Sequence, residues 1–174
     1  MIMRVKNKQI YFYKEYIQYV KLCYFIYEKG VDMVKFFFCL RNCIKNKKMF
    51  FLYPIYRIIG LLYGSAIPLT CKIGTNIKFM HGLYGIFISG GARVESNVTI
   101  YQHVTIGGIW TDSKNKGAPT IGEGSTLYPG CKIIGNVTIG KNCNIGPNVV
   151  IWYDIDENMT VVFEKNAYRM MKNV

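Results

Sequence analysis

Large apolar residues, nearly all aliphatic, recur at intervals of six from residue 67 to residue 151, with two interruptions. The positions are Ile67, Ile73, Phe79, Ile88, Val94, Ile100, Ile106, Ile121, Leu127, Ile133, Ile139, Ile145 and Ile151. A second position, usually small, follows four residues after each of them, as at Cys71, Ala92, Ser125, Cys131 and Cys143. Two inward positions in six residues predict a short strand and a turn, and three such units close one triangular coil. The pattern therefore predicts a parallel β-helix over residues 65–162.

Residues that tolerate a positive φ angle occupy the predicted turns. Gly74, Gly122, Gly140 and Gly146 directly follow an aliphatic position, and an Asn or another Gly comes two residues later. Both residue types accept the left-handed backbone of a tight corner. A stack of such coils is open at both ends and needs caps. We expect residues 1–64 to cover one end and residues 163–174 to cover the other.

Residues 1–64 have apolar side chains at helical spacing instead, for example at Ile17 and around Ile58 and Leu62. Pro54 fits the first turn of the last helix. This pattern predicts two or three helices in an N-terminal α-helical region. The fold class is therefore mainly β, with helices confined to the N-terminal third.

The positive charge of the chain is concentrated in this helical region. The net charge is +12, and residues 1–63 hold twelve basic and three acidic residues. A basic, aromatic and amphipathic surface is typical of peripheral contact with an anionic membrane, and it is equally compatible with packing on the chain itself or on a neighbouring subunit. No basic stripe of a known nucleic-acid-binding module is present, so we expect no nucleic acid partner.

Six cysteines and two histidines are the candidate soft ligands. No C-x-x-C pair occurs, so the sequence predicts no metal site. Cys71, Cys131 and Cys143 fall on inward positions, where cysteine acts as a small hydrophobe.

The charge-free run IIGLLYGSAIPLTC has 14 residues, fewer than the roughly 18 of a membrane-spanning helix. Without a charged and apolar leader, the expected location is the cytoplasm, with peripheral contact at the inner face of the membrane as an option.

Two interruptions break the six-residue repeat, and functional residues concentrate where a repeat is interrupted. The segment FMHGLYGIFISGG carries three extra residues beside His81. The segment IGGIWTDSKNKGAPT leaves the pattern and predicts a polar arm over residues 109–120, with Trp110 at its base. One interruption therefore presents an imidazole, and the other projects a loop.

The segment GSAIPLTCKIGTNIKFMHGLYGIFISGGARVESNVTIYQHVTIGG, followed by APTIGEGSTLYPGCKIIGNVTIG, resembles the hexapeptide-repeat acyltransferases of the serine-acetyltransferase-like branch. Within that branch it is most similar to the colanic-acid and capsular polysaccharide acetyltransferases, which share YRIIGLLYG-like text. The resemblance covers about residues 50–162. It implies a left-handed β-helix, acetyl-CoA as cosubstrate, a homotrimer, and an active site in the groove between two subunits.

The resemblance also implies roles for single residues. His81 matches the catalytic histidine in its H-x-x-x-G-I-x-I setting, and an imidazole is a suitable base for a hydroxyl proton at neutral pH. Backbone N–H groups near Gly107 or Gly108 match the donors for the oxyanion. A second interpretation is that these two glycines only begin the arm. Gly108 is also expected to contact the cofactor.

Further residues are expected around the substrates. The candidate acceptor-binding residues are Tyr84, Trp110, His103 and Glu95. The group expected to orient His81 is either Glu95 or a backbone carbonyl. His103 either faces the groove or is simply exposed. Lys165 and Arg169, together with Lys172, are candidate donors to the CoA phosphates.

Three positions depart from true serine acetyltransferases, which have a carboxylate, an acid and a second histidine where this chain has Ala66, Met80 and Ala118. Free serine would find fewer polar partners there. The expected function is therefore acetyl-CoA-dependent O-acetylation of a surface-polysaccharide sugar or its lipid-linked precursor. Serine O-acetylation and a non-catalytic trimeric scaffold are the alternatives.

Overall fold

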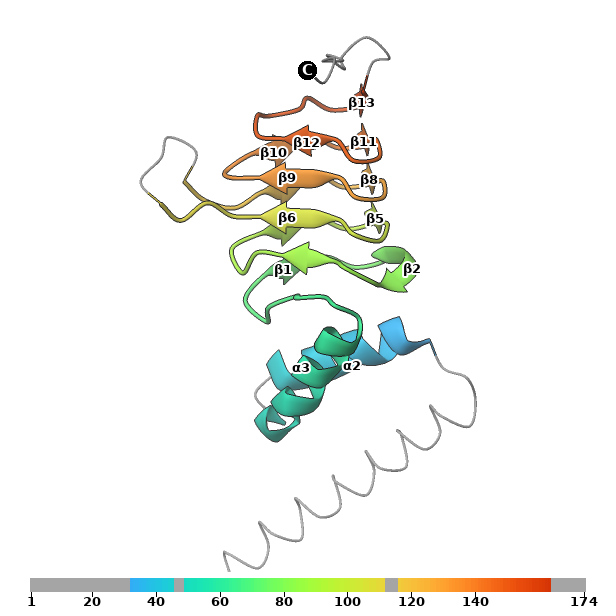
Figure 1. The fold of residues 1–174 in the computed structure, drawn as a ribbon, viewed down its shortest axis with the longest axis vertical. Coiled ribbons are helices and arrows are strands. Elements are labelled where there is room, and N and C mark those ends of the chain that lie inside the picture. The colour runs from blue at the N-terminus through green and yellow to red at the C-terminus, as the bar shows by residue number, and fades with distance from the viewer. Residues whose placement is uncertain (1–31, 46–48, 112–115, 164–174) are drawn as a thin grey trace, which may run out of the picture.

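The computed structural model describes residues 32–45, 49–111 and 116–163. It consists of a parallel β-helix that stands on a pair of helices (Figure 1). The helical end comprises α2 (Met33–Lys45), the 3-10 turn η1 (Phe50–Leu52) and α3 (Tyr53–Leu62). Pro54 lies in the first turn of α3, as predicted. The predicted helical segment around Ile17 lies outside the described residues.

The strands of the β-helix are two to six residues long and follow one another at short intervals. They are β1 (Lys72–Ile73), β2 (Lys78–Leu83), β3 (Phe87–Ile88), β4 (Arg93–Val94), β5 (Thr99–Ile100), β6 (Thr105–Gly107), β7 (Thr120–Ile121), β8 (Thr126–Leu127), β9 (Lys132–Ile134), β10 (Thr138–Ile139), β11 (Asn144–Ile145), β12 (Val150–Ile151) and β13 (Thr160–Val161).

The strands form three parallel sheets, and each coil contributes one strand to each sheet. The first sheet has the order β1-β4-β7-β10, the second β13-β11-β8-β5-β2 and the third β12-β9-β6-β3. The register pairs the sixth-position residues of successive coils, for example Val94 with Ile121 and Ile106 with Ile133. The hexapeptide period therefore sets both the fold and the register, which confirms the predicted parallel β-helix.

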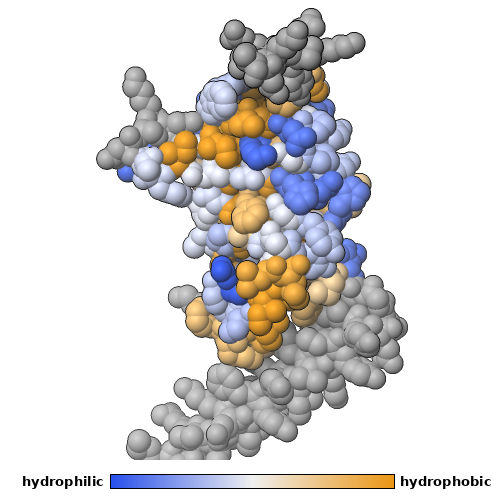
Figure 2. Space-filling model, in the orientation of Figure 1, coloured by the Kyte–Doolittle hydropathy of each residue, from blue (hydrophilic) through white to orange (hydrophobic). Residues whose placement is uncertain are grey.

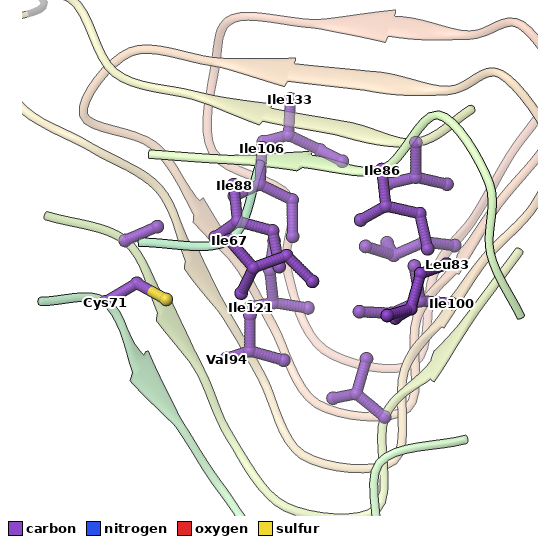
Figure 3. Packing of buried hydrophobic residues seen from close by; sticks show 14 of the residues in the cluster. Ile67, Cys71, Leu83, Ile86, Ile88, Val94, Ile100, Ile106, Ile121 and Ile133 are labelled. Carbon is purple, nitrogen blue, oxygen red and sulfur yellow. The ribbon is translucent and has the colours of Figure 1, made fainter. Parts of the chain in front are cut away.

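The paired aliphatic side chains fill the interior of the triangle (Figure 3). Ile106, Ile133 and Ile151 have no exposed surface, and the same holds for the small inward residues Cys71 and Cys131. Burial raises the pKa of the Cys131 thiol to about 12, which keeps it protonated. These cysteines are therefore core residues, as the sequence predicts.

Asparagine occupies corner positions where the backbone is left-handed. Asn76, Asn97 and Asn142 have φ angles of 54°, 61° and 54°. The amide nitrogen of Asn76 donates to the side-chain oxygen of Asn97 at 2.7 Å, and Asn97 donates to Glu123 Oε1 at 2.7 Å. Asparagine tolerates this backbone at little cost and links one coil to the next.

The helical end covers the first coil and so acts as the predicted cap. Phe37 and Leu40 of α2 are buried against it. Arg41 is also buried, and its Nη2 donates to the carbonyl oxygen of Cys71 at 2.7 Å. The hydroxyl of Tyr56 on α3 donates to the carbonyl of Ile67, and burial raises the pKa of Tyr56 to about 12. The predicted cap at the other end, residues 163–174, lies almost entirely outside the described residues.

Among the described residues, no helix is long and apolar enough to cross a membrane.

Candidate active site

The three corners of the β-helix separate the residues that the sequence singles out. Corner 1 joins the first sheet to the second, corner 2 the second to the third, and corner 3 the third to the first. Glu95 follows β4 and lies at corner 1, whereas His81 lies in β2 and precedes corner 2. Gly107 and Gly108 lie at corner 3. One chain therefore does not bring all the candidates together.

Corner 2 carries a cavity of about 760 Å³. Its walls include His81, Tyr84, Gln102, His103, Thr105 and Lys132, with Gly64 and Phe87 at the side of the helical end. They come from three successive coils, because β3, β6 and β9 are stacked in the third sheet. Among the described residues of the wall, none is a carboxylate, and Lys132 is the single lysine or arginine.

The three extra residues beside His81 make a fixed bulge at this corner. Leu83 and Ile86 both point inward and have no exposed surface, so the bulge is anchored in the core. Gly82 and Gly85 take positive φ angles of 72° and 64°, which are open to glycine without steric cost. The Gly85 N–H donates to the carbonyl of Tyr63 at 3.0 Å. The bulge therefore leaves the His81 side chain exposed on the wall of the cavity.

Tyr101 supports the histidine from the next coil. Its ring centroid lies 5.7 Å from that of His81, and it stacks on Tyr128 of the following coil at 5.3 Å. A column of three rings therefore rises along the second sheet. Among the described residues, no carboxylate accepts a hydrogen bond from His81, whose ring is tilted by 55° to that of Tyr101.

His103 faces the same cavity. It has a φ angle of 59°, and its N–H donates to the carbonyl of Tyr84 at 2.9 Å. Its ring lies over Gly85, since a Cβ atom at that glycine would come within 2.2 Å of His103 Nδ1. Of the two interpretations left by the sequence, the structure favours a histidine that is exposed and also lines the pocket.

Gln102 is a wall residue that the sequence did not indicate. Its side-chain oxygen is buried and has no hydrogen-bond donor among the described residues. A buried acceptor without a donor costs free energy. The repeat pattern could place Gln102 at a corner, but only coordinates could show that its oxygen is left without a partner.

Glu95 lies away from His81 within one chain. Its carboxylate lies 3.5 Å from the guanidinium of Arg93, and both groups are about half exposed. It is absent from the wall of the cavity because corner 1 is a different edge of the triangle. The expected contact of Glu95 with the acceptor or with His81 is therefore not made within one chain, and it stays a prediction for the assembled site.

Trp110 lies at corner 3 with Gly107 and Gly108, away from His81. Added Cβ atoms at Gly91 and Gly108 would come within 2.9 and 3.1 Å of the Trp110 ring. The arm begins there as an antiparallel pair, since Ile109 and Gly117 exchange N–H to carbonyl hydrogen bonds of 2.8 Å. Gly107, Gly108 and Trp110 therefore keep their predicted roles only if a second copy brings corner 3 to corner 2.

The candidate CoA contacts Lys165 and Arg169, together with Lys172, lie outside the described residues.

Three residues differ from those expected in a serine acetyltransferase. Met80 is exposed, Ala118 lies near Trp110 at corner 3, and Ala66 pairs with Phe87. No cluster of three or more potential metal ligands occurs in the part of the chain that the structure describes.

Comparisons with known proteins extend this picture. Residues 118–151 match the family model described as bacterial transferase hexapeptide (six repeats). The chain is 34% identical to the serine acetyltransferase of Bacillus licheniformis over 68% of its own length and 54% of the relative's. It is 34% identical to that of Staphylococcus xylosus over 76% of its length and 61% of the relative's. The chain thus spans just over half the length of these curated relatives.

Solved structures of serine acetyltransferases are also similar to this chain. A serine acetyltransferase in complex with CoA matches with a TM-score of 0.62 and 27% identity, over 76% of this chain and 53% of that one. A complex with cysteine matches with a TM-score of 0.63 and 26% identity, over 80% and 56%. These neighbours are consistent with the expected left-handed winding. They do not support the narrower likeness to colanic-acid and capsular enzymes. The chain carries the hexapeptide repeat of the bacterial transferases, and its β-helix is similar in sequence and fold to serine acetyltransferases.

Proposed function

We propose that this chain transfers an acetyl group from acetyl-CoA to a hydroxyl group, with His81 as the general base. The observation that carries the proposal is an exposed imidazole on the wall of a 760 Å³ cavity, in a β-helix similar to serine acetyltransferases. A ring nitrogen of His81 accepts the hydroxyl proton while the oxygen attacks the thioester carbonyl. The carbon–sulfur bond then breaks, and the CoA thiolate takes up the proton.

A homotrimer would complete this site. Hexapeptide transferases are typically trimeric, and a neighbouring copy could bring its corner 3 to the cavity at corner 2. The N–H groups of Gly107 and Gly108 would then be donors to the oxyanion, as the resemblance implies. The need for a neighbour follows from the position of these glycines on another corner of the same chain.

Serine is the acceptor that the comparisons favour, because the reported relatives and neighbours are serine acetyltransferases. This supports the alternative of the sequence analysis better than its leading interpretation. The proposed acceptor is therefore the hydroxyl of free serine.

A neutral sugar is the second candidate, and the cavity wall favours it. Free serine carries an ammonium group, whereas the described wall offers it no carboxylate. A neutral sugar would bind against this wall without the cost of an unpaired charge.

The test is to identify the acetylated product by mass spectrometry after incubation of the full chain with acetyl-CoA and either serine or a panel of sugars. We expect O-acetylserine with wild type and none with His81→Ala, while Lys141→Ala, an exposed residue elsewhere on the β-helix, retains activity. Acetylated sugar without acetylserine would establish the second candidate. CoA binding with no product from any acceptor would overturn the proposal in favour of the scaffold.

A further inference from the structure

Helix α3 has three distinct faces. Tyr56 and Ile59 point at the first coil and are buried. Arg57 and Leu61 border a groove between α3 and that coil. The third face carries Phe51 from η1 and Ile55, Ile58 and Leu62 from α3, which we call the outer stripe. Their spacing of four, three and four residues aligns them along one side of a helix.

The outer stripe is apolar and exposed to solvent. The exposed fractions of its four side chains are 46% for Phe51, 45% for Ile55, 55% for Ile58 and 77% for Leu62. Figure 2 shows hydrophobic side chains gathered over the helical end of the molecule. A helix that is apolar on nearly every side is normally covered on every side. The described residues of the chain therefore leave the outer stripe uncovered.

The charge of the helical end indicates what kind of partner the outer stripe fits. Lys35, Lys45 and Arg57 are exposed, and Asp32 is the single acidic residue in the described part of residues 32–63. Over residues 1–63, twelve basic residues face three acidic ones. A second copy docked through the same end would set like charges against each other, which is unfavourable. An anionic surface would instead be attracted.

We propose that the outer stripe lies on the surface of an anionic lipid bilayer. Phe51, Ile55, Ile58 and Leu62 would enter the boundary between head groups and acyl chains, while Lys35, Lys45 and Arg57 meet lipid phosphates. The helices lie at one end of the molecule and β13 at the other (Figure 1). The β-helix would therefore project away from the membrane. This inference does not depend on the acceptor or on acetyl transfer.

The experiment measures co-sedimentation of the full chain with large vesicles of phosphatidylcholine alone or mixed with phosphatidylglycerol. We expect binding to the anionic vesicles that weakens in 0.5 M salt. The double variant Ile58→Glu/Leu62→Glu should lower the partition coefficient by about tenfold or more. Arg57→Glu should weaken binding to anionic vesicles only. Met159→Glu, a half-exposed residue beside β13 at the opposite end, is the matched control and should bind as wild type.

Two results would overturn the proposal: wild type fails to bind anionic vesicles, or the double variant binds them as well as wild type. If wild type does not bind, a change in the molar mass of the double variant, measured by light scattering, would make the stripe an interface between copies. An unchanged mass without vesicle binding would assign the cover to residues 1–31. Circular dichroism and thiol release with a soluble acceptor should match wild type for every variant, which separates this test from the acetyltransferase proposal.

Discussion

The coils of the β-helix and helix α3 are both rich in isoleucine and leucine, yet they bury them very differently. Ile133 has residues of the same kind above and below it, Ile106 and Ile151, and no exposed surface. Ile58, at 55% exposure, has no such neighbour on its outer side among the described residues. A repeat buries its own apolar surface because each coil covers the next. A single helix over the end of the stack can do so on one face only, and its other face is available for binding.

The largest effect should come from truncating the interior of the β-helix. Ile133→Ala removes a fully buried side chain and leaves a cavity between two coils, so the free energy of unfolding should fall by about 2–5 kcal/mol. Ile58→Ala removes the same atoms from the outer stripe and should change it by no more than about 0.5 kcal/mol. Urea unfolding of both variants measures the difference. Equal losses would show that the outer stripe is already covered within the isolated chain.

A smaller effect should come from the corners. Asn142 has a φ angle of 54°, so Asn142→Ala should cost about 1 kcal/mol, because a Cβ-bearing residue without a local polar group disfavours this backbone. Asn142→Gly should remain closer to wild type, because glycine accepts the angle freely. Thermal unfolding followed by circular dichroism would order the two variants. A glycine variant that is less stable than the alanine variant would instead assign the stability to the side-chain bond with Asn158, which measures 3.4 Å.

Much of the β-helix could be predicted from the sequence because every coil repeats the same pattern of apolar positions. Each pair such as Val94 and Ile121 is set by the same period, so one coil predicts the next. The bulge at His81 was also predictable, since three extra residues interrupt that period. The position of Pro54 in α3 follows from its fixed φ angle and missing N–H.

The site was only partly predictable because sequence spacing does not say which corner a side chain serves. His81, Tyr84 and His103 meet at corner 2, whereas Glu95 turns to Arg93 at corner 1. Gln102 became a candidate only when its buried oxygen was found without a donor. For the helical region, the pattern left membrane contact and packing against protein as alternatives, because a period of 3.6 residues does not reveal how many faces of a helix are covered.

The measurement that tests the central claim most directly is kcat/KM for thiol release from acetyl-CoA by wild type and His81→Asn, with CoA affinity measured on the same samples by calorimetry. The asparagine side chain keeps polarity but cannot act as a base. We predict that kcat/KM falls by about 10²–10⁴-fold while CoA affinity stays within about threefold. A variant that retains wild-type kcat/KM would contradict the assignment of His81 as the base and, with it, the proposed active site at corner 2.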